Sequence, residues 1–366
     1  MIRPNFPRIA KKIVRTCAAI KEDDTVVVMG RDDALSFCEL IALECGKVGA
    51  LPLVRIYSDN YTLRRFLDVP QEFLKKTPRH FKALLRETDA VISVGMDFQD
   101  PARFRRVPEE KLGAARIGSK PLSDVVYDRK RRWIGTGFPT RQQARVYGIR
   151  FASFHDMYWK AMDIDYRDLN KRCLKLRSRV EGEATARITS DKGTDLTLSL
   201  KGRHWVADDG VIGPEDIAAR EPFLNLPSGE ICAAPLEDSA NGTAVFDFAF
   251  YRGHRIRDLQ LRFKDGQAKA VRAAEGLKVF RNVIKNTHGD NDRIGELGIG
   301  MNPSVKRAVG YTLTDEKIIG TIHMAIGDNR MLGGRNNSDL HWDLVIVKPT
   351  LVIGETKVMD HGRYRV

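Results

Sequence analysis

The chain of 366 residues is long enough for two domains, and its 42% hydrophobic content argues against a disordered protein. Its 61 Lys and Arg residues outnumber its 48 Asp and Glu residues, giving a net charge of +13, and residues 1–180 carry 36 of the basic side chains against 22 acidic ones. No run of 18 apolar residues and no apolar leader occur, so we expect a cytoplasmic protein without a membrane partner.

The first half of the chain alternates short β-branched runs with helical patterns. We expect helices at Pro7–Ile20 and Ala34–Val48, further helical stretches up to Glu87, and strands at Thr25–Gly30, Leu51–Tyr57, Ala90–Gly95 and Trp133–Gly137. Strands separated by helices indicate a doubly wound, mainly parallel sheet. Two charged helices, Phe151–Ala161 and Tyr166–Arg179, should connect this layer to the second half.

The second half changes to strands separated by turns. We expect one helix at about Gly276–Asn286, a last block of strands and loops from Ile294 onwards, and strands at Ala184–Thr189, Thr194–Leu200, Ile231–Ala234, Gly242–Phe250 and Leu259–Phe263. The predicted fold class is therefore α/β. An N-terminal doubly wound domain would span residues 1–182, and a C-terminal α+β domain that binds metal would span residues 183–366.

Basic clusters occur only in the first half, at Lys75–His80, Arg103–Arg106, Arg129–Arg132 and Lys171–Arg179. They accompany no nucleic-acid-binding motif, and the spacing of the last cluster is typical of a solvated helix face, so we do not expect nucleic acid as a partner. Arg105 and Arg129–Arg132 stay candidates for contacting an acidic substrate or a partner subunit.

Two other features predict no separate function. The first strand–turn–helix has the single glycine Gly30 in place of a glycine-rich fingerprint, so we do not expect a dinucleotide there. The five cysteines form no CxxC pair and lie mostly in apolar helical patterns, which predicts reduced core residues.

Candidate metal ligands lie in the second half. On a strand at Leu340–Val347, His341 and Asp343 would point to the same face, and an imidazole beside a carboxylate suits a divalent ion. His323 lies in an apolar strand, where an imidazole needs a hydrogen bond or a metal. Taken singly, both features also fit ordinary structural roles.

Two carboxylates occur in similar apolar settings. Glu230 opens an apolar strand after the turn Asn225–Gly229, and Glu296 lies among glycines and aliphatic residues. Each alone also fits a structural ion pair. Together, Glu230, Glu296, His323, His341 and Asp343 provide three carboxylates and two imidazoles, enough for two divalent ions that share a bridging water.

The sequence resembles the aminopeptidase T family of dinuclear metallopeptidases. The resemblance is carried by four motifs in the same order, at Asn225–Glu230 with Ala234-Pro235, at Arg293–Leu297, at His323–Gly327, and at Gly333–Ser338 ahead of His341-Trp342-Asp343. It implies an aminopeptidase whose metal ligands are Glu230, Glu296, His323, His341 and Asp343. It also implies a homodimer that acts on peptides with a free N-terminus, using two ions of zinc, cobalt or manganese.

The chain differs from the family in two places. Arg330 stands where the longer peptidases carry a tyrosine seven residues after the motif histidine, and the stretch from His323 to His341 is shorter. This short stretch is similar to that of the dihydroxypyridine dioxygenases, related iron enzymes that lack a match for Glu230. The alternatives are therefore a mononuclear Fe(II) ring-cleaving dioxygenase, using for example Glu296, His341 and Asp343, or another metal-dependent amide hydrolase.

For the peptidase, we expect two metals to activate a bridging water and to stabilise the oxyanion formed by its attack. Glu230 or Glu296 could also carry the proton, which the sequence alone does not decide. Arg330 would replace the tyrosine as an electrophile or bind a substrate carboxylate, although an exposed loop arginine fits the pattern equally well.

Overall fold

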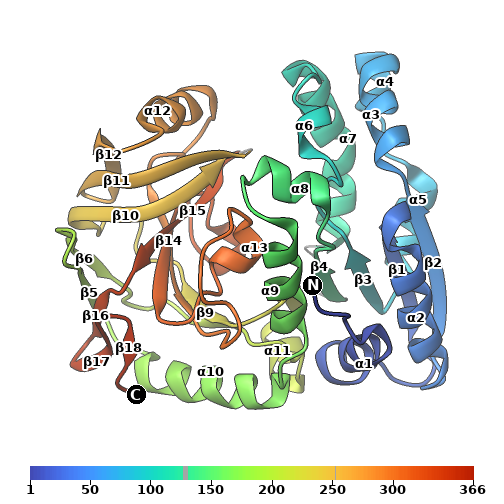
Figure 1. Ribbon diagram of the computed structural model, residues 1–366, viewed down its shortest axis with the longest axis horizontal. Coiled ribbons are helices and arrows are strands. Elements are labelled where there is room, and N and C mark those ends of the chain that lie inside the picture. Colours follow the sequence, from blue (N-terminus) through green and yellow to red (C-terminus); the bar gives the residue numbers. More distant parts are fainter. Residues whose placement is uncertain (127–130, 252) are drawn as a thin grey trace. The chain divides into compact units, whose positions relative to one another are not determined.

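The computed structural model describes residues 1–126, 131–251 and 253–366, which form two compact units (Figure 1). One unit comprises Met1–Arg167 and Gly210–Leu226, and the other comprises Asp168–Asp209 and Pro227–Val366. Helix α10 (Tyr166–Val180) lies mostly in the second unit, and the segment Gly210–Leu226 returns to the first.

The first unit is built on a five-stranded parallel sheet with the order β2-β1-β3-β4-β8. Its strands are β1 (Thr25–Arg31), β2 (Leu51–Tyr57), β3 (Ala90–Val94), β4 (Arg132–Thr136) and β8 (Phe223–Leu226). The first four match the predicted strands to within about one residue. β8 was not predicted, because it is a short segment that joins the parallel sheet from beyond residue 182 and pairs with β4.

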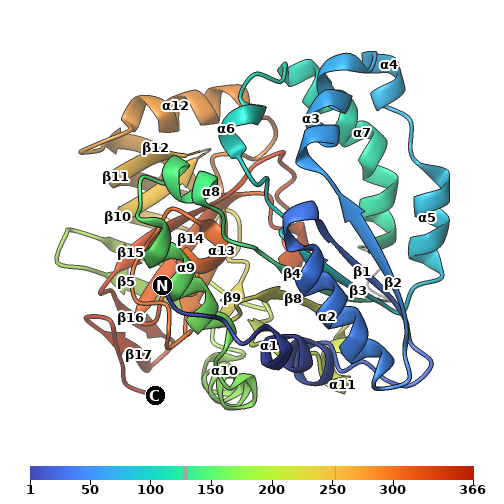
Figure 2. The same cartoon turned by 45° about the vertical axis from the view of Figure 1, so that its right-hand side comes forward.

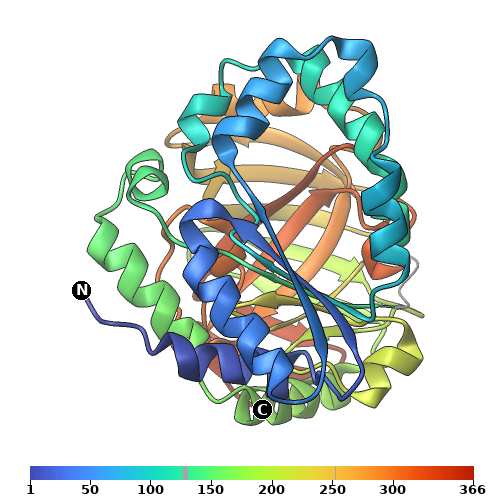
Figure 3. The same ribbon diagram turned by 90° about the vertical axis from the view of Figure 1, so that its right-hand side faces the viewer.

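Helices cover both faces of this sheet (Figures 2 and 3). On one face, Leu85 of α5 and Val125 of α7 pack against Val27 and Val91 of the central strands. On the other face, α2 lies against β1 and β2, and α1 packs on α2. The helices are α1 (Phe6–Lys12), α2 (Leu35–Gly46), α3 (Asp59–Asp68), α4 (Gln71–Leu74), α5 (Arg79–Arg86), α6 (Pro101–Phe104), α7 (Glu109–Val126), α8 (Arg141–Val146), α9 (Phe151–Met162) and α11 (Pro214–Ala219), with a π-helical turn Ile13–Cys17 after α1 and a 3₁₀ turn Asp32–Ala34 before α2. The predicted doubly wound arrangement is confirmed.

The second unit is built on a large antiparallel sheet with the order β18-β17-β16-β5-β6-β10-β15-β14-β13-β9-β7, to which β11 and β12 add beside β10. Its strands are β5 (Thr185–Thr189), β6 (Asp195–Ser199), β7 (Val206–Asp208), β9 (Glu230–Ala233), β10 (Asn241–Tyr251), β11 (His254–Lys264), β12 (Gln267–Arg272), β13 (Ile294–Gly300), β14 (Thr321–Gly327), β15 (His341–Val347), β16 (Thr350–Ile353), β17 (Thr356–Asp360) and β18 (Arg363–Tyr364).

Few helices accompany this sheet. Helix α12 (Leu277–Asn286) lies along β11 and β12 (Figure 1), and Phe280 from this helix stacks on Trp342 of β15. The remaining helical elements are α10, the short helix α13 (Thr312–Asp315) and the 3₁₀ turn η3 (Arg330–Leu332). The predicted α+β character of this half is confirmed.

The basic clusters have mostly structural surroundings. On α10, Lys171 and Lys175 are exposed, whereas Cys173 and Leu176 are buried, as expected of a solvated helix face. Arg132 is buried and donates to the carbonyls of Ala18 and Ala19. Arg129 and Lys130 of the same cluster lie outside the described residues. All five cysteines are buried and reduced, as predicted.

Among the described residues, no helix combines the length and the apolar character needed to span a membrane.

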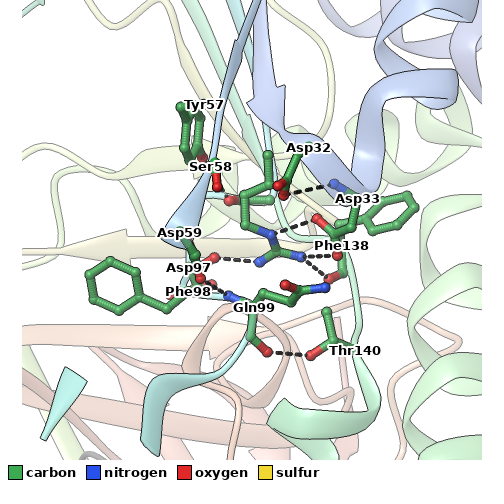
Figure 4. A network of polar contacts seen from close by, with 12 residues as sticks. Asp32, Asp33, Tyr57, Ser58, Asp59, Asp97, Phe98, Gln99, Phe138 and Thr140 are labelled. Carbon is green, nitrogen blue, oxygen red and sulfur yellow. Dashed lines mark hydrogen bonds and ion pairs between the residues drawn. The ribbon is translucent and has the colours of Figure 1, made fainter. Parts of the chain in front are cut away.

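A buried arginine ties together the loops at the carboxyl ends of the parallel strands (Figure 4). The Arg31 side chain, at the end of β1, is fully buried. Its Nε and one terminal nitrogen donate to the two carboxylate oxygens of Asp33, at 2.9 and 3.1 Å. The guanidinium also donates to the carbonyls of Asp97, after β3, and Phe138, after β4. Open α/β sheets commonly bind ligands at this edge, where the strand order reverses, and here a guanidinium fills the position.

We predict that Arg31→Met lowers the free energy of unfolding by about 3–5 kcal/mol, because Asp33 and two carbonyls lose their buried cation. Urea denaturation measures the change. The matched control is Arg64→Met, since Arg64 is exposed and its ion-pair partner among the described residues is Asp68 on the same helix. This control should cost less than about 0.5 kcal/mol. Equal stability of the two variants would contradict a central role for Arg31.

Candidate metal centre

Four neighbouring strands bring the five predicted ligands to one face of the antiparallel sheet. Residues paired directly across antiparallel strands point to the same face. The pairs are Glu230 with Gly300, Glu296 with Ala325, His323 with Gly298, Asp343 with Ala325, and His341 with Gly327. Each candidate ligand thus has glycine or alanine at one of its paired positions, and these small residues leave space in which the ligand groups meet.

Glu296 lies between the two histidines. One of its carboxylate oxygens is 3.2 Å from Nε2 of His323, and the other is 3.2 Å from Nε2 of His341. Glu230 approaches His323 Nε2 at 3.4 Å, and Asp343 approaches His341 Nε2 at 3.5 Å. The predicted residues therefore form one cluster in which a single carboxylate faces both imidazoles.

Two ligand groups can be distinguished within this cluster. Glu296, His341 and Asp343 place one ligand atom each within 4.8 Å of one another, and Glu230 and His323 do the same with a further carboxylate, Glu316. Glu316 follows α13 and was not predicted. It lies in the charged run Asp315-Glu316-Lys317, which in the sequence resembles a solvated turn and gives no signal of a site.

Lys317 is a second functional residue that sequence reasoning missed. Its side chain is fully buried, and its ammonium group forms ion pairs with the carboxylates of Glu230, Asp208 (2.9 Å) and Glu316 (3.5 Å). One oxygen of Glu230 is thereby occupied by Lys317, while the other oxygen is directed toward His323. Lys317 supplies the fixed positive charge that a buried acidic cluster requires.

Two carboxylate oxygens in the cluster indicate that these residues fit a metal centre, and this observation does not depend on the resemblance to a family. Oε2 of Glu230 and Oδ1 of Asp343 are buried and accept no hydrogen bond from the residues that the structure describes, and each approaches the Nε2 of a histidine. Buried polar atoms rarely lack a hydrogen-bond partner, and carboxylate oxygens grouped with imidazole nitrogens are the donors that zinc, cobalt or manganese accept.

The pKa values of the two histidines show that the carboxylates of the cluster favour protonated imidazoles. Burial opposes the charged form of His323, but the carboxylates of Glu230 and Glu296 outweigh it and raise its pKa to about 9. Desolvation likewise opposes protonation of His341, yet Asp343 and Glu296 raise its pKa well above the usual value. Burial would raise the pKa of Glu296, but hydrogen bonds from both imidazoles hold it below its usual value. Divalent ions would displace the protons that the histidines hold.

A neighbouring backbone group orients His341. The imidazole Nδ1 is 2.7 Å from the carbonyl oxygen of Asp328, so Nδ1 carries the proton and Nε2 faces the carboxylates. The predicted catalytic residue Arg330 lies nearby on η3 with its side chain 56% exposed, and its guanidinium binds the Asp328 carboxylate. Arg330 thus contacts the residue that orients His341, and its catalytic role stays a prediction.

The loop between β14 and β15 is held by buried polar contacts, which explain the motif Gly333–Ser338. Asn336 donates to the carbonyls of Ile294 and Gly327, and its own amide donates to the Asn329 side chain. A Cβ atom at Gly334 would overlap Asn329, so glycine is required there. These contacts fix the segment that presents the Asp328 carbonyl to His341.

A mixed α/β fold that carries two groups of carboxylate and imidazole ligands defines a metalloprotein. The chain matches the family described as thermophilic metalloprotease (M29) over residues 3–363, and it belongs to that family.

Curated relatives agree with this assignment. The chain is 26% identical to aminopeptidase PepS of Streptococcus thermophilus over 94% of both chains. It is 24% identical to aminopeptidase T of Thermus thermophilus, covering 99% of this chain and 98% of the relative. The predicted resemblance is confirmed.

Solved structures share the fold. Wild-type AmpT from Thermus thermophilus superposes with a TM-score of 0.77 at 21% identity, over 99% of both chains. The 2,5-dihydroxypyridine dioxygenase from Pseudomonas putida KT2440 superposes with a TM-score of 0.67 at 15% identity, over 98% of this chain and 96% of that one. The predicted fold class is confirmed, and the dioxygenase, which represents one of the predicted alternatives, shares this fold.

We predict that Gly298→Ala disrupts the cluster, because a Cβ atom at this position would overlap the His323 imidazole from the paired strand. The variant should lower the affinity for added divalent metal by about 10–100-fold, as expected when a ligand loses its orientation. Calorimetric titration of the metal-free protein with zinc measures the affinity. Gly113→Ala is the control, since a Cβ atom there meets nothing within 4 Å. Unchanged zinc affinity in Gly298→Ala would contradict the proposed role of His323.

Proposed function

We propose that this metalloprotease is an aminopeptidase that removes N-terminal residues from peptides with the help of two divalent metal ions. The position of Glu296 carries the proposal, because a carboxylate with one oxygen toward each of two imidazoles is suited to span two ions. The names of the curated relatives support the aminopeptidase assignment.

The two ligand groups would each hold one ion. Glu296, His341 and Asp343 form one group, and Glu230 and His323 form the core of the other. Zinc, cobalt or manganese ions bound there would lower the pKa of a water molecule and polarise the scissile carbonyl. The chain itself contributes the fixed geometry of the sheet, the cation of Lys317, and the negative potential that attracts the ammonium group of a peptide.

We assign the transfer of the proton to Glu316. The two carboxylates predicted for this task are more closely engaged, since Glu296 faces both histidines and Glu230 binds Lys317 directly. Glu316 lies farther from the Lys317 ammonium group, at 3.5 Å. Glu316 also lies within reach of the Glu230 and His323 ligand atoms. It would take a proton from the attacking water and return it to the departing amine.

The mononuclear Fe(II) ring-cleaving dioxygenase is the second candidate, and its shared fold is the observation in favour. Glu230 argues for the hydrolase, because it adds a carboxylate beside His323 and so completes a second ligand group. Another metal-dependent amide hydrolase would use the same residues. The homodimer, the cytoplasmic location and the domain limits at 182 and 183 rest on the sequence and stay predictions.

We predict two zinc, cobalt or manganese ions per chain in protein purified without oxygen, measured by elemental analysis. Glu296→Gln should lower metal affinity by more than about 100-fold, because losing a ligand should exceed the loss of an outer hydrogen bond. It should also abolish metal-dependent cleavage of peptides with free N-termini.

The control for this variant is Glu355→Gln, at an exposed position of the turn between β16 and β17. A single iron per chain, with oxygen consumed on an electron-rich aromatic substrate, would favour the dioxygenase. Full metal content and activity in Glu296→Gln would exclude the proposed centre.

We predict that Glu316→Gln lowers kcat for peptide cleavage by about 10²–10⁴-fold while the metal content stays at the wild-type level. Steady-state kinetics and elemental analysis of the same preparation separate the two effects. Loss of one metal ion in this variant would instead make Glu316 a ligand, and unchanged kcat would remove it from the reaction.

A further inference from the structure

A pocket adjoins the ligand cluster and is lined by both acidic and apolar residues. Its acidic residues are Asp315, Glu316 and Asp343, and its apolar residues include Phe248 and Phe250 of β10 and Val345 of β15. Phe248 pairs directly with Val345, so these two residues share the face of the sheet that carries Asp343. The pocket therefore joins a candidate metal ligand to two aromatic rings.

The free space between these walls is small. The cavity holds about 10 Å³, which is the room of a single water molecule or a methyl group. The Phe248 and Phe250 ring centroids are 6.3 Å apart. The Phe250 ring also lies directly against the backbone of Gly310, where a Cβ atom would approach the ring to 2.8 Å. Phe250 is therefore supported from behind and limits the depth of the pocket.

The geometry of a peptide N-terminus matches this arrangement. The first residue carries its ammonium group, its side chain and the scissile carbonyl within one or two bonds of the same Cα atom. When the carbonyl lies at the ligand cluster, the side chain must enter the adjoining space. The acidic residues of the pocket suit the ammonium group, and its aromatic residues suit an apolar side chain.

We propose that this pocket binds the side chain of the N-terminal residue and restricts the substrates to peptides that begin with a small apolar residue such as alanine. Phe250 sets the size limit. This inference rests on the proposed aminopeptidase function and names its substrate class. Specific apolar pockets discriminate by about 1–3 kcal/mol per methylene group, which corresponds to 10–200-fold in kcat/KM.

The test uses the metal-loaded full chain with p-nitroanilides of alanine, leucine, phenylalanine and glutamate. We expect kcat/KM for the alanine substrate to exceed that for leucine and phenylalanine by at least about 10-fold. Phe250→Ala should reverse this order by raising kcat/KM for the leucine and phenylalanine substrates. Tyr251→Phe is the control, because Tyr251 is on the opposite face of β10 and packs on Trp342.

Calorimetric binding of free alanine and phenylalanine to the same two proteins gives a readout that does not depend on turnover. If no p-nitroanilide is cleaved, yet alanine binds more tightly than phenylalanine and Phe250→Ala reverses the order, the pocket assignment stands and the aminopeptidase proposal fails. If the wild-type chain cleaves and binds bulky residues as well as alanine, or if Phe250→Ala changes all substrates by one factor, the pocket assignment is wrong.

Discussion

Pairing between β9, β13, β14 and β15 determines whether the candidate metal ligands meet at all. Each ligand depends on a neighbouring strand that offers glycine or alanine at the paired position, as Gly298 does for His323. Side chains on a strand alternate between faces, so a slip of one residue would turn a whole set of ligands away from the cluster. The backbone hydrogen bonds of the sheet hold the carboxylates together against their mutual repulsion.

This repulsion explains the other charged residues around the site. Carboxylates gathered in a buried space require cations, and without metal the imidazoles of His323 and His341 and the ammonium of Lys317 provide them. The histidines can give up their protons to metal, whereas Lys317 stays charged and keeps one oxygen of Glu230 away from the ion. The site thus separates exchangeable positive charge from permanent positive charge.

The sequence predicted the parts of the fold that depend on local pattern. Short β-branched runs located β1 to β4, and the i, i+2 spacing placed His341 and Asp343 on one face. Glu230, Glu296 and His323 stood out because polar side chains in apolar strands need partners. Their convergence followed from the resemblance to a family, since strand order and register are long-range properties.

Other residues could not be predicted, for identifiable physical reasons. Glu316 and Lys317 lie in a run of charged residues that local pattern assigns to solvent. In the structure Lys317 is buried, and it pairs with Glu316 and with the carboxylates of Asp208 and Glu230 from distant strands. The strand β8 joins a sheet whose other strands precede it by about 90 residues or more. Local sequence patterns do not reveal pairing between segments that are so far apart in the chain. Arg330 was predicted as a catalytic residue from its spacing to His323. That spacing gives no information about the ion pair between Arg330 and the Asp328 carboxylate.

The Arg31 guanidinium provides, from within the chain, contacts at the edge of the parallel sheet where other proteins bind a small molecule. Many open α/β sheets leave the crevice at their carboxyl edge for a nucleotide or another small molecule, and binding of that molecule contributes to the stability of the folded state. In this chain the Arg31 side chain lies at that edge, and its partners, Asp33 and the carbonyls of Asp97 and Phe138, belong to the loops that follow the neighbouring strands β1, β3 and β4. The contacts that hold these loops together therefore come from within the chain.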